Sequence, residues 1–142
     1  MAPPDNRLQF VLINNSSTPA YELYRGAGNG FWKQVRSPQP QAYQGTRWFG
    51  LAWDHGKQTL YSGSEQQYLL RSTTAANLDE STITWEIAYD FGLDVQPMVL
   101  TIGPQGALYV QLRRSTGNSL VRGIRAGDMW KWTILPIFSP FD

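Results

Sequence analysis

The sequence repeats one arrangement three times: an arginine at the end of an apolar run, then a hairpin-like stretch, then a tryptophan. The arginines are 46 and 51 residues apart, at Arg25, Arg71 and Arg122. The tryptophans that follow them are Trp32, Trp85 and, in the last unit, Trp130 or Trp132. A period of this length is typical of folds in which one repeat cannot bury its apolar face alone. We therefore expect a single domain over 1–142 that contains three units, about 7–46, 47–95 and 96–142.

Apolar runs of strand length fill each unit. Segments such as QFVLI, WFGLAW and TITWEIAY are rich in Val, Ile, Thr, Tyr and Trp, and turn residues separate them. The 13 glycines and 9 prolines are spread along the chain, and no long window keeps a helical period. The sequence predicts an all-β fold.

Each complete unit is expected to contain four strands. The predicted strands of the middle unit are 48–53, 58–63, 67–72 and 82–89, and those of the last are 97–102, 107–113, 118–124 and 129–135. The first unit supplies only three, which are 8–14, 20–26 and 31–36. Its first strand is missing, so this unit is expected to be incomplete.

The middle hairpin, within LLRSTTAANLDESTITWEI, resembles the Asp-box or BNR repeat of sialidase-like β-propellers. That family pattern is Ser/Thr-x-Asp-x-Gly-x-Thr-Trp, and Ser72, Thr84 and Trp85 match its ends. Asp79 is not clearly in the Asp position of the motif, and its Gly is lost. LYRGAGNGFW and LVRGIRAGDMW look like shorter relatives, and the blades of tectonin and tachylectin-type lectins are also similar. The resemblance implies three propeller-like blades.

The resemblance also assigns a structural role to the repeated hairpin, because the Asp-box of the family lies away from the active site. By that resemblance the arginines and tryptophans of the three units hold blades together, and the residues concerned are Arg25, Trp32, Arg71, Trp85, Arg122 and Trp130. The alternative folds for this pattern are a β-trefoil and a β-sandwich.

Three blades do not close a ring, since propellers contain 4–8. We therefore expect a homodimer in which two chains form a six-bladed ring. The missing first strand is expected to come from the C-terminal PIFSPFD of the same or a neighbouring chain.

Composition excludes several kinds of site. The chain has no cysteine, which removes disulfides and thiolate-ligated metals, and its single histidine, His55, makes a zinc site improbable. A net charge of +1 gives no reason to expect a nucleic-acid or membrane partner. No signal peptide is visible, so the expected location is cytoplasmic by default. Neither a cofactor nor a metal is expected.

A ligand site is expected at the propeller face that carries the links from one blade to the next and the links between each second and third strand. These links are SPQPQAYQGTRW, DFGLDVQ, GSEQQ and RRSTGN. The candidate ligand-binding residues are Tyr43, Arg47, Trp48, Asp90, Asp94, Arg113 and Arg114. Aromatic rings beside fixed polar groups suit sugar rings or extended peptides.

The predicted function is a non-catalytic, lectin-like module that binds a carbohydrate or small ligand. The alternative is a protein–protein interaction or assembly module without a small-molecule site. A glycosidase-like enzyme is a weaker alternative, because its chemistry depends on the distance between two carboxyl groups, such as those of Asp90 and Asp94, which the sequence does not give.

Overall fold

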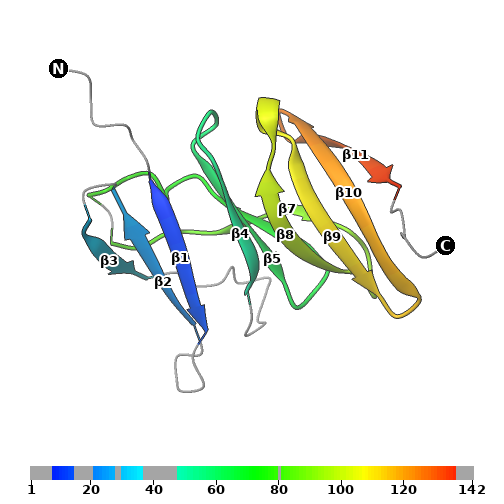
Figure 1. Cartoon of the computed structure of the whole chain (residues 1–142), viewed down its shortest axis with the longest axis horizontal. Coiled ribbons are helices and arrows are strands. Elements are labelled where there is room, and N and C mark those ends of the chain that lie inside the picture. The colour runs from blue at the N-terminus through cyan, green and yellow to red at the C-terminus, as the bar shows by residue number, and fades with distance from the viewer. Residues whose placement is uncertain (1–7, 15–20, 28–29, 37–47, 80, 137–142) are drawn as a thin grey trace.

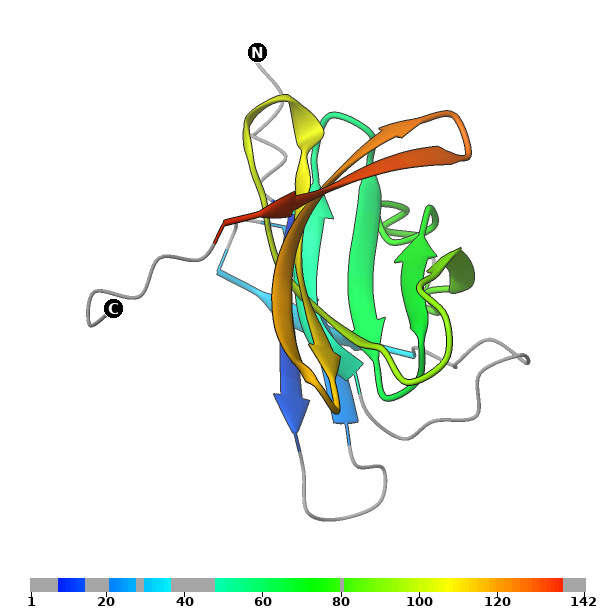
Figure 2. The ribbon, with the colours of Figure 1, turned by 90° about the vertical axis from the view of Figure 1, so that its right-hand side faces the viewer.

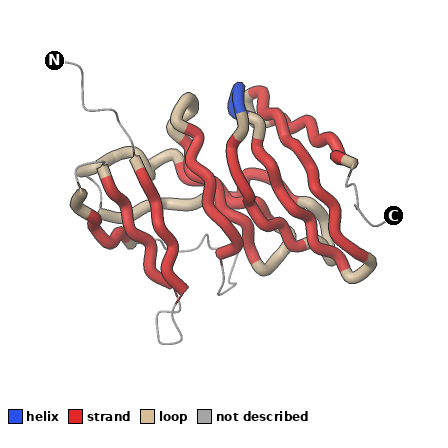
Figure 3. The backbone as a smooth tube through the Cα atoms, in the orientation of Figure 1, coloured by secondary structure: helices blue, strands red, loops and turns tan. Residues whose placement is uncertain are grey.

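The structure is a computed structural model that describes residues 8–14, 21–27, 30–36, 48–79 and 81–136. The described residues contain eleven β-strands and one short 3-10 turn, Pro104–Gly106 (Figure 3). The prediction of an all-β fold is confirmed. The described part of the chain has no helix long and apolar enough to span a membrane.

The strands form three antiparallel sheets, each of which lies within one of the predicted units (Figure 1). The first sheet has the order β1 (Gln9–Asn14), β2 (Tyr21–Gly26), β3 (Trp32–Val35). The second has the order β4 (Trp48–Asp54), β5 (Thr59–Ser64), β6 (Tyr68–Ser72), β7 (Glu86–Asp90). The third consists of β8 (Gln96–Ile102), β9 (Leu108–Arg114), β10 (Gly117–Ala126) and β11 (Met129–Leu135), also paired in chain order. Each sheet is therefore a simple meander.

The sheets pack in chain order, with the second between the first and the third (Figures 1 and 2). The first junction, between the first and second sheets, buries Leu23, Val35, Leu60, Leu70, Ala75, Ile83 and Trp85. The second junction, between the second and third sheets, buries Ala52, Tyr61, Leu69, Val95, Val99, Leu108, Val110, Leu112 and Val121. Because it is covered on both faces, the second sheet includes a strand, β5, that is buried at all six positions.

The three sheets share one cross-strand pair, an aromatic residue opposite an arginine. The registers place Phe10 opposite Arg25, Tyr61 opposite Arg71 and Tyr109 opposite Arg122. The adjacent position pairs a glycine with a tryptophan in the two outer sheets, as Gly26 with Trp32 and Gly123 with Trp132. The residue of the last sheet that corresponds to Trp32 is therefore Trp132, whereas Trp130 lies opposite Arg125.

The first strands of the two four-stranded sheets approach each other closely. The register of β4 with β5 shifts between Phe49 and Leu51, which leaves Gly50 at a bulge with φ 78°. The register of β8 with β9 shifts in the same way between Val99 and Thr101. A Cβ added to Gly50 would lie 1.9 Å from the carbonyl oxygen of Val99. Only glycine suits this contact, because it tolerates the positive φ and has no side chain.

The second sheet departs from its prediction at the last strand, which was expected over 82–89 and begins at Glu86. The backbone ahead of it pairs with the first sheet instead. Arg36 N–H donates to the Ser81 carbonyl at 2.8 Å, and Ile83 N–H donates to the Arg36 carbonyl at 2.7 Å. Because these groups bond across the first junction, they are not available to extend the pairing of β6 with β7.

The alternative folds can be compared with the described strands. These strands form no closed barrel, which a β-trefoil requires, and they form three sheets where a β-sandwich has two. The source of a further strand beside β1 was expected in PIFSPFD, and residues 137–142 of that segment lie outside the described residues.

Candidate functional site

The arginines of the first and second sheets contact the sheet that follows. Arg25 is 6% exposed, and its guanidinium donates to the carbonyl oxygens of Ala75 at 2.9 Å and Asn77 at 3.1 Å. Burial lowers the pKa of Arg25. Both acceptors lie in the hairpin between β6 and β7, so the guanidinium joins the first sheet to the second.

Arg71 occupies the corresponding position in the second sheet. Its guanidinium pairs with the Glu86 carboxylate at 2.7 Å and with the Asp128 carboxylate at 3.2 Å. Burial alone would lower the pKa of Arg71, but hydrogen bonds to the two carboxylates raise it. Asp128 lies in the turn between β10 and β11, so this side chain joins the second sheet to the third.

The tryptophans differ in exposure along the stack. Trp85 is 8% exposed within the first junction, whereas Trp32 is 44% exposed on the outer side of the first sheet. Trp130 and Trp132 stack with ring centroids 4.9 Å apart and an interplanar angle of 11°, packed against the second junction. Arg122 is exposed on the third sheet.

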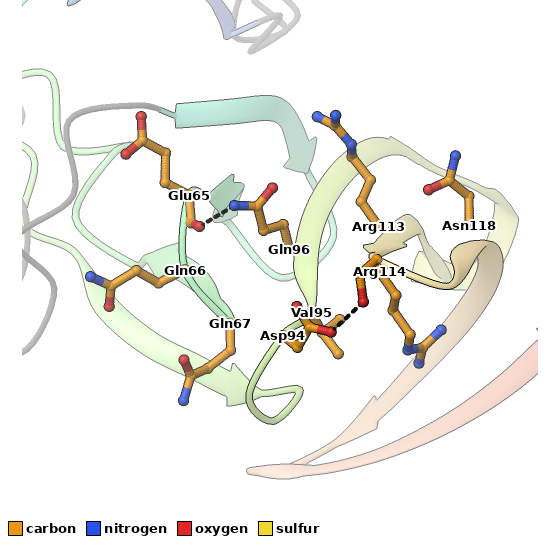
Figure 4. A pocket seen from close by; sticks show the side chains of 10 residues that line it. Glu65, Gln66, Gln67, Asp94, Val95, Gln96, Arg113, Arg114 and Asn118 are labelled. Atoms are coloured by element: carbon orange, nitrogen blue, oxygen red, sulfur yellow. Dashed lines mark hydrogen bonds between the residues drawn. The ribbon is translucent and has the colours of Figure 1, made fainter.

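A polar cleft lies where three links of the second and third sheets converge (Figure 4). The links are the β5–β6 turn, the β7–β8 connection and the β9–β10 hairpin. The volume of this polar cleft is about 540 Å³, and its lining residues are Glu65, Gln66, Gln67, Asp94, Val95, Gln96, Arg113, Arg114, Ser115 and Asn118. Segments more than 50 residues apart in the sequence therefore form one concave surface.

Hydrogen bonds to the backbone fix the first wall of the polar cleft. The buried hydroxyl of Ser64 bonds to the carbonyl oxygens of Gln66 at 3.0 Å and Tyr68 at 2.7 Å. Gln96 Nε2 donates to the Glu65 carbonyl at 2.7 Å, which ties the β7–β8 connection to this turn. The β5–β6 turn is thereby held by a side chain of its own sheet, Ser64, and by one of the third sheet, Gln96.

The second wall is fixed by an aspartate in a rare backbone conformation. Asp94 has φ 68°, a left-handed geometry that Asp tolerates better than most residues. Its Oδ2 accepts a hydrogen bond from the Ser115 hydroxyl at 2.8 Å, which joins the β7–β8 connection to the β9–β10 hairpin. In Figure 4 this bond crosses the middle of the group of side chains.

The two arginines of the polar cleft have different surroundings. Arg114 donates to the Ser119 hydroxyl at 3.1 Å. Arg113 makes no hydrogen bond or ion pair with the residues that the structure describes, and it is exposed. The two side chains point in opposite directions from the end of β9 (Figure 4), as alternation along a strand requires.

The structure brings together three of the predicted ligand-binding residues, Asp94, Arg113 and Arg114. Asp90 does not line the polar cleft; its carboxylate accepts a hydrogen bond from the Gly92 N–H at 2.8 Å and so stabilises the turn. Tyr43 and Arg47 lie outside the described residues. Trp48 begins β4, but the placement of its side chain lies outside the described part of the chain.

The amide side chains of the polar cleft were not predicted individually, and they are Gln66, Gln67, Gln96 and Asn118. Their links GSEQQ, DFGLDVQ and RRSTGN were expected at this end of the strands. The recurrence of amide residues in links expected at one face is the signal that could have identified them.

The chemistry of the polar cleft is that of hydrogen bonding. Its lining offers amide, guanidinium, hydroxyl and carboxylate groups at positions set by three short links. The described residues include no group of three or more His, Cys, Asp or Glu that could hold a metal ion. His55 lies away from the polar cleft, in the exposed turn between β4 and β5, with its Nδ1 3.4 Å from Gln58 Nε2.

The comparisons with known proteins gave no match: no family model, no curated protein and no solved structure matches this chain.

Proposed function

We propose that this chain is a non-catalytic binding module whose polar cleft takes a hydroxyl-rich ligand of the carbohydrate class. The observation that carries the proposal is the convergence of three separate links on one concave, polar surface. Clefts of about 300–1,000 Å³ are the usual size for small-molecule sites, and the volume of about 540 Å³ lies in this range.

The polar lining favours a sugar over an apolar ligand. Most small-molecule sites are lined chiefly by apolar side chains, with a few polar groups that orient the ligand. Here nine of the ten lining residues are polar or charged, and Val95 is the exception. Amide groups such as those of Gln67 and Asn118 carry both donors and acceptors, as a ligand with several hydroxyl groups requires.

In this proposal the sheets are the blades of a β-propeller. The support is that each sheet is a meander, that the sheets pack face to face in chain order, and that the first strands β4 and β8 lie against each other. The β6–β7 hairpin, which resembles the Asp-box, joins the opposite ends of the strands from the links of the polar cleft. That position agrees with a structural role for the hairpin and a binding role for the links.

Glycan binding tests the proposal directly. The chain is applied to a glycan array, and the affinity for each positive glycan is measured by titration calorimetry. Arg113→Ala is expected to weaken binding at least about tenfold, since a hydrogen bond to a charged group contributes about 1.5–3 kcal/mol. This variant leaves the bond between Asp94 and Ser115 intact, so the shape of the polar cleft is retained.

The matched control is Lys57→Ala, which removes an exposed cationic side chain from the β4–β5 turn, outside the polar cleft. It is expected to bind glycans as the parent chain does. Equal losses in the two variants, or no binding on a broad array, would count against a carbohydrate site.

The second candidate is a protein-interaction module without a small-molecule site. It is favoured by the apolar side chains exposed on the outer sheets, among them Ile13 and Ile124. A silent glycan array, together with a mass greater than that of one chain in solution, would favour this candidate.

A further inference from the structure

We propose that two copies of this chain associate head to tail. The outer face of the third sheet of each copy docks onto the outer face of the first sheet of the other copy. The inference is independent of the ligand proposed for the polar cleft. It begins from a contact that both junctions share.

Each junction contains an arginine that reaches from one sheet to a hairpin of the next. Arg25 donates to the Ala75 and Asn77 carbonyls, in the hairpin that joins the last two strands of the second sheet. Arg71 pairs with Asp128, in the turn that joins the last two strands of the third sheet. The arginine at the same register position therefore reaches the hairpin before the last strand of the following sheet in both junctions.

The third sheet has an arginine at the same register position, and it forms no hydrogen bond or ion pair with the described residues. Arg122 lies opposite Tyr109, as Arg71 lies opposite Tyr61, but Arg122 is exposed. Exposed apolar side chains lie on the same side of the sheet: Ile124, two residues further along β10, is 44% exposed, and Met129, which pairs with Ala126, is 75% exposed. This outer face of the third sheet, hereafter the arginine face, has the groups that the first two sheets use to bind the next one.

The first sheet presents the other open face of the stack. Its outer side carries Trp32, which is 44% exposed, and Val11 and Ile13, each 42% exposed. We call this side the tryptophan face. In the second sheet the tryptophan after the arginine, Trp85, is 8% exposed because the preceding sheet covers it. The tryptophan face therefore lacks a preceding sheet, just as the arginine face lacks a following one.

The two faces belong to opposite ends of one chain, so a second copy supplies the partner that each requires. Apolar sheet faces left open are prone to uncontrolled association. A head-to-tail contact makes either a ring or an open filament, depending on whether its rotation closes. Two copies bring six sheets, within the 4–8 blades of closed propellers, while three copies would bring nine. We therefore infer a ring of two copies.

The first test is the mass of the 142-residue chain in solution. One copy has a mass of 16.1 kDa, and light scattering at micromolar concentration is expected to give about twice that value. The mass of a single copy would overturn the proposal. A series of increasing masses or fibres would overturn the closed ring.

Two single variants test the two faces. Arg122→Glu changes the arginine face and Val11→Lys changes the tryptophan face, and both residues are exposed, so the fold is expected to persist by circular dichroism. Each variant alone is expected to be monomeric. The charge-matched control is Arg114→Glu, which lies in the polar cleft and not on either face, and it is expected to keep the mass of the parent chain.

Mixing the two variants distinguishes a head-to-tail contact from a symmetric one. The Arg122→Glu copy keeps an intact tryptophan face, and the Val11→Lys copy keeps an intact arginine face. The mixture can therefore form one good contact, and it is expected to recover a species of two copies that neither variant forms alone. No recovery, or a Val11→Lys variant that dimerises by itself, would overturn the head-to-tail arrangement.

Discussion

The two junctions of the stack place an arginine at the same register position but hold it in different ways. In the first junction Arg25 is 6% exposed and donates to two main-chain carbonyl oxygens. In the second junction Arg71 pairs with two carboxylates whose side chains are 55% exposed in Glu86 and 91% exposed in Asp128. One guanidinium is buried against backbone, and the other forms ion pairs near the solvent.

The difference follows from the length of the hairpin that each arginine meets. Between β6 and β7 the chain runs through thirteen residues, 73–85, which is enough to fold over Arg25 and turn carbonyl groups toward it. Between β10 and β11 only Gly127 and Asp128 intervene, so the turn offers a side chain. Hairpin length therefore decides whether this contact is a buried hydrogen-bonded one or an exposed ion pair.

The second junction depends more on apolar packing. Tyr89, Phe91 and Trp132 form an aromatic cluster with ring centroids 4.8–5.4 Å apart. Tyr61 is 1% exposed, and its burial raises the pKa of its hydroxyl. The contact of Gly50 with Val99 joins the backbones of the two sheets. An exposed ion pair adds little to an interface of this kind.

The largest expected effect comes from Gly50→Ala, which would separate the backbones at the second junction. The new Cβ would meet the Val99 carbonyl oxygen at 1.9 Å and would also be held at φ 78°. We expect the free energy of unfolding to fall by about 4 kcal/mol, from overpacking and left-handed strain together. Urea denaturation of the parent chain and of the variant measures this difference in the free energy of unfolding.

The control for this change is Gly92→Ala, at φ 95° with no atom within 4 Å of the added Cβ. It carries the backbone strain without the collision, and a loss of only about 1–2 kcal/mol is expected. Equal losses at the two glycines would show that the close approach of β4 to β8 adds nothing.

An intermediate effect is expected from Arg25→Met, which keeps an apolar side chain but removes the guanidinium from the first junction. The carbonyl groups of Ala75 and Asn77 lose a donor, and we expect a loss of about 2 kcal/mol in the free energy of unfolding. Arg71→Met is the matched change at the second junction. Its expected cost is below about 1 kcal/mol, because Glu86 and Asp128 can be hydrated. If Arg71→Met lowered the free energy of unfolding more than Arg25→Met does, the arginine of the second junction would be the more important of the two.

The smallest expected effect comes from Asp128→Asn, which removes one carboxylate from the second junction. Its expected cost is at most about 0.5 kcal/mol at low salt, and it should disappear in 1 M NaCl because salt screens exposed pairs. Thermal unfolding at two salt concentrations measures it. Asp79→Asn, an exposed aspartate of the other hairpin, is the control and should show no such salt dependence. An effect of Asp128→Asn that persists in high salt would argue against a simple ion pair.

The sequence was sufficient to predict the strands because turn residues interrupt nearly every apolar run. All eleven predicted strands overlap observed ones, and β11 has the predicted bounds 129–135. The largest difference in bounds is at the strand predicted over 82–89, which begins only at Glu86. Ile83 bonds to Arg36 across the first junction, and no local pattern reports a partner 47 residues away.

The polar cleft was predictable only as a region. Three of the four expected links, GSEQQ, DFGLDVQ and RRSTGN, do converge, because alternate connections of a meander lie at the same end of the strands. Residues 37–47 of the fourth, SPQPQAYQGTRW, lie outside the described residues. The individual contacts depend on geometry that residue types do not reveal. Asp94 faces Ser115 because its backbone adopts φ 68°, while Asp90, four residues earlier, is bonded to Gly92.

The complete burial of β5 has a consequence for how such a chain can evolve. Its sequence TLYSGS is buried at every position, with Leu60 packed in the first junction and Tyr61 in the second, so few substitutions there leave the packed volume unchanged. The turn that directly follows β5, with Glu65, Gln66 and Gln67, carries no such constraint on side-chain size, since it borders solvent. Descendants of this chain would therefore accept substitutions in the turn after β5 more readily than in the strand itself.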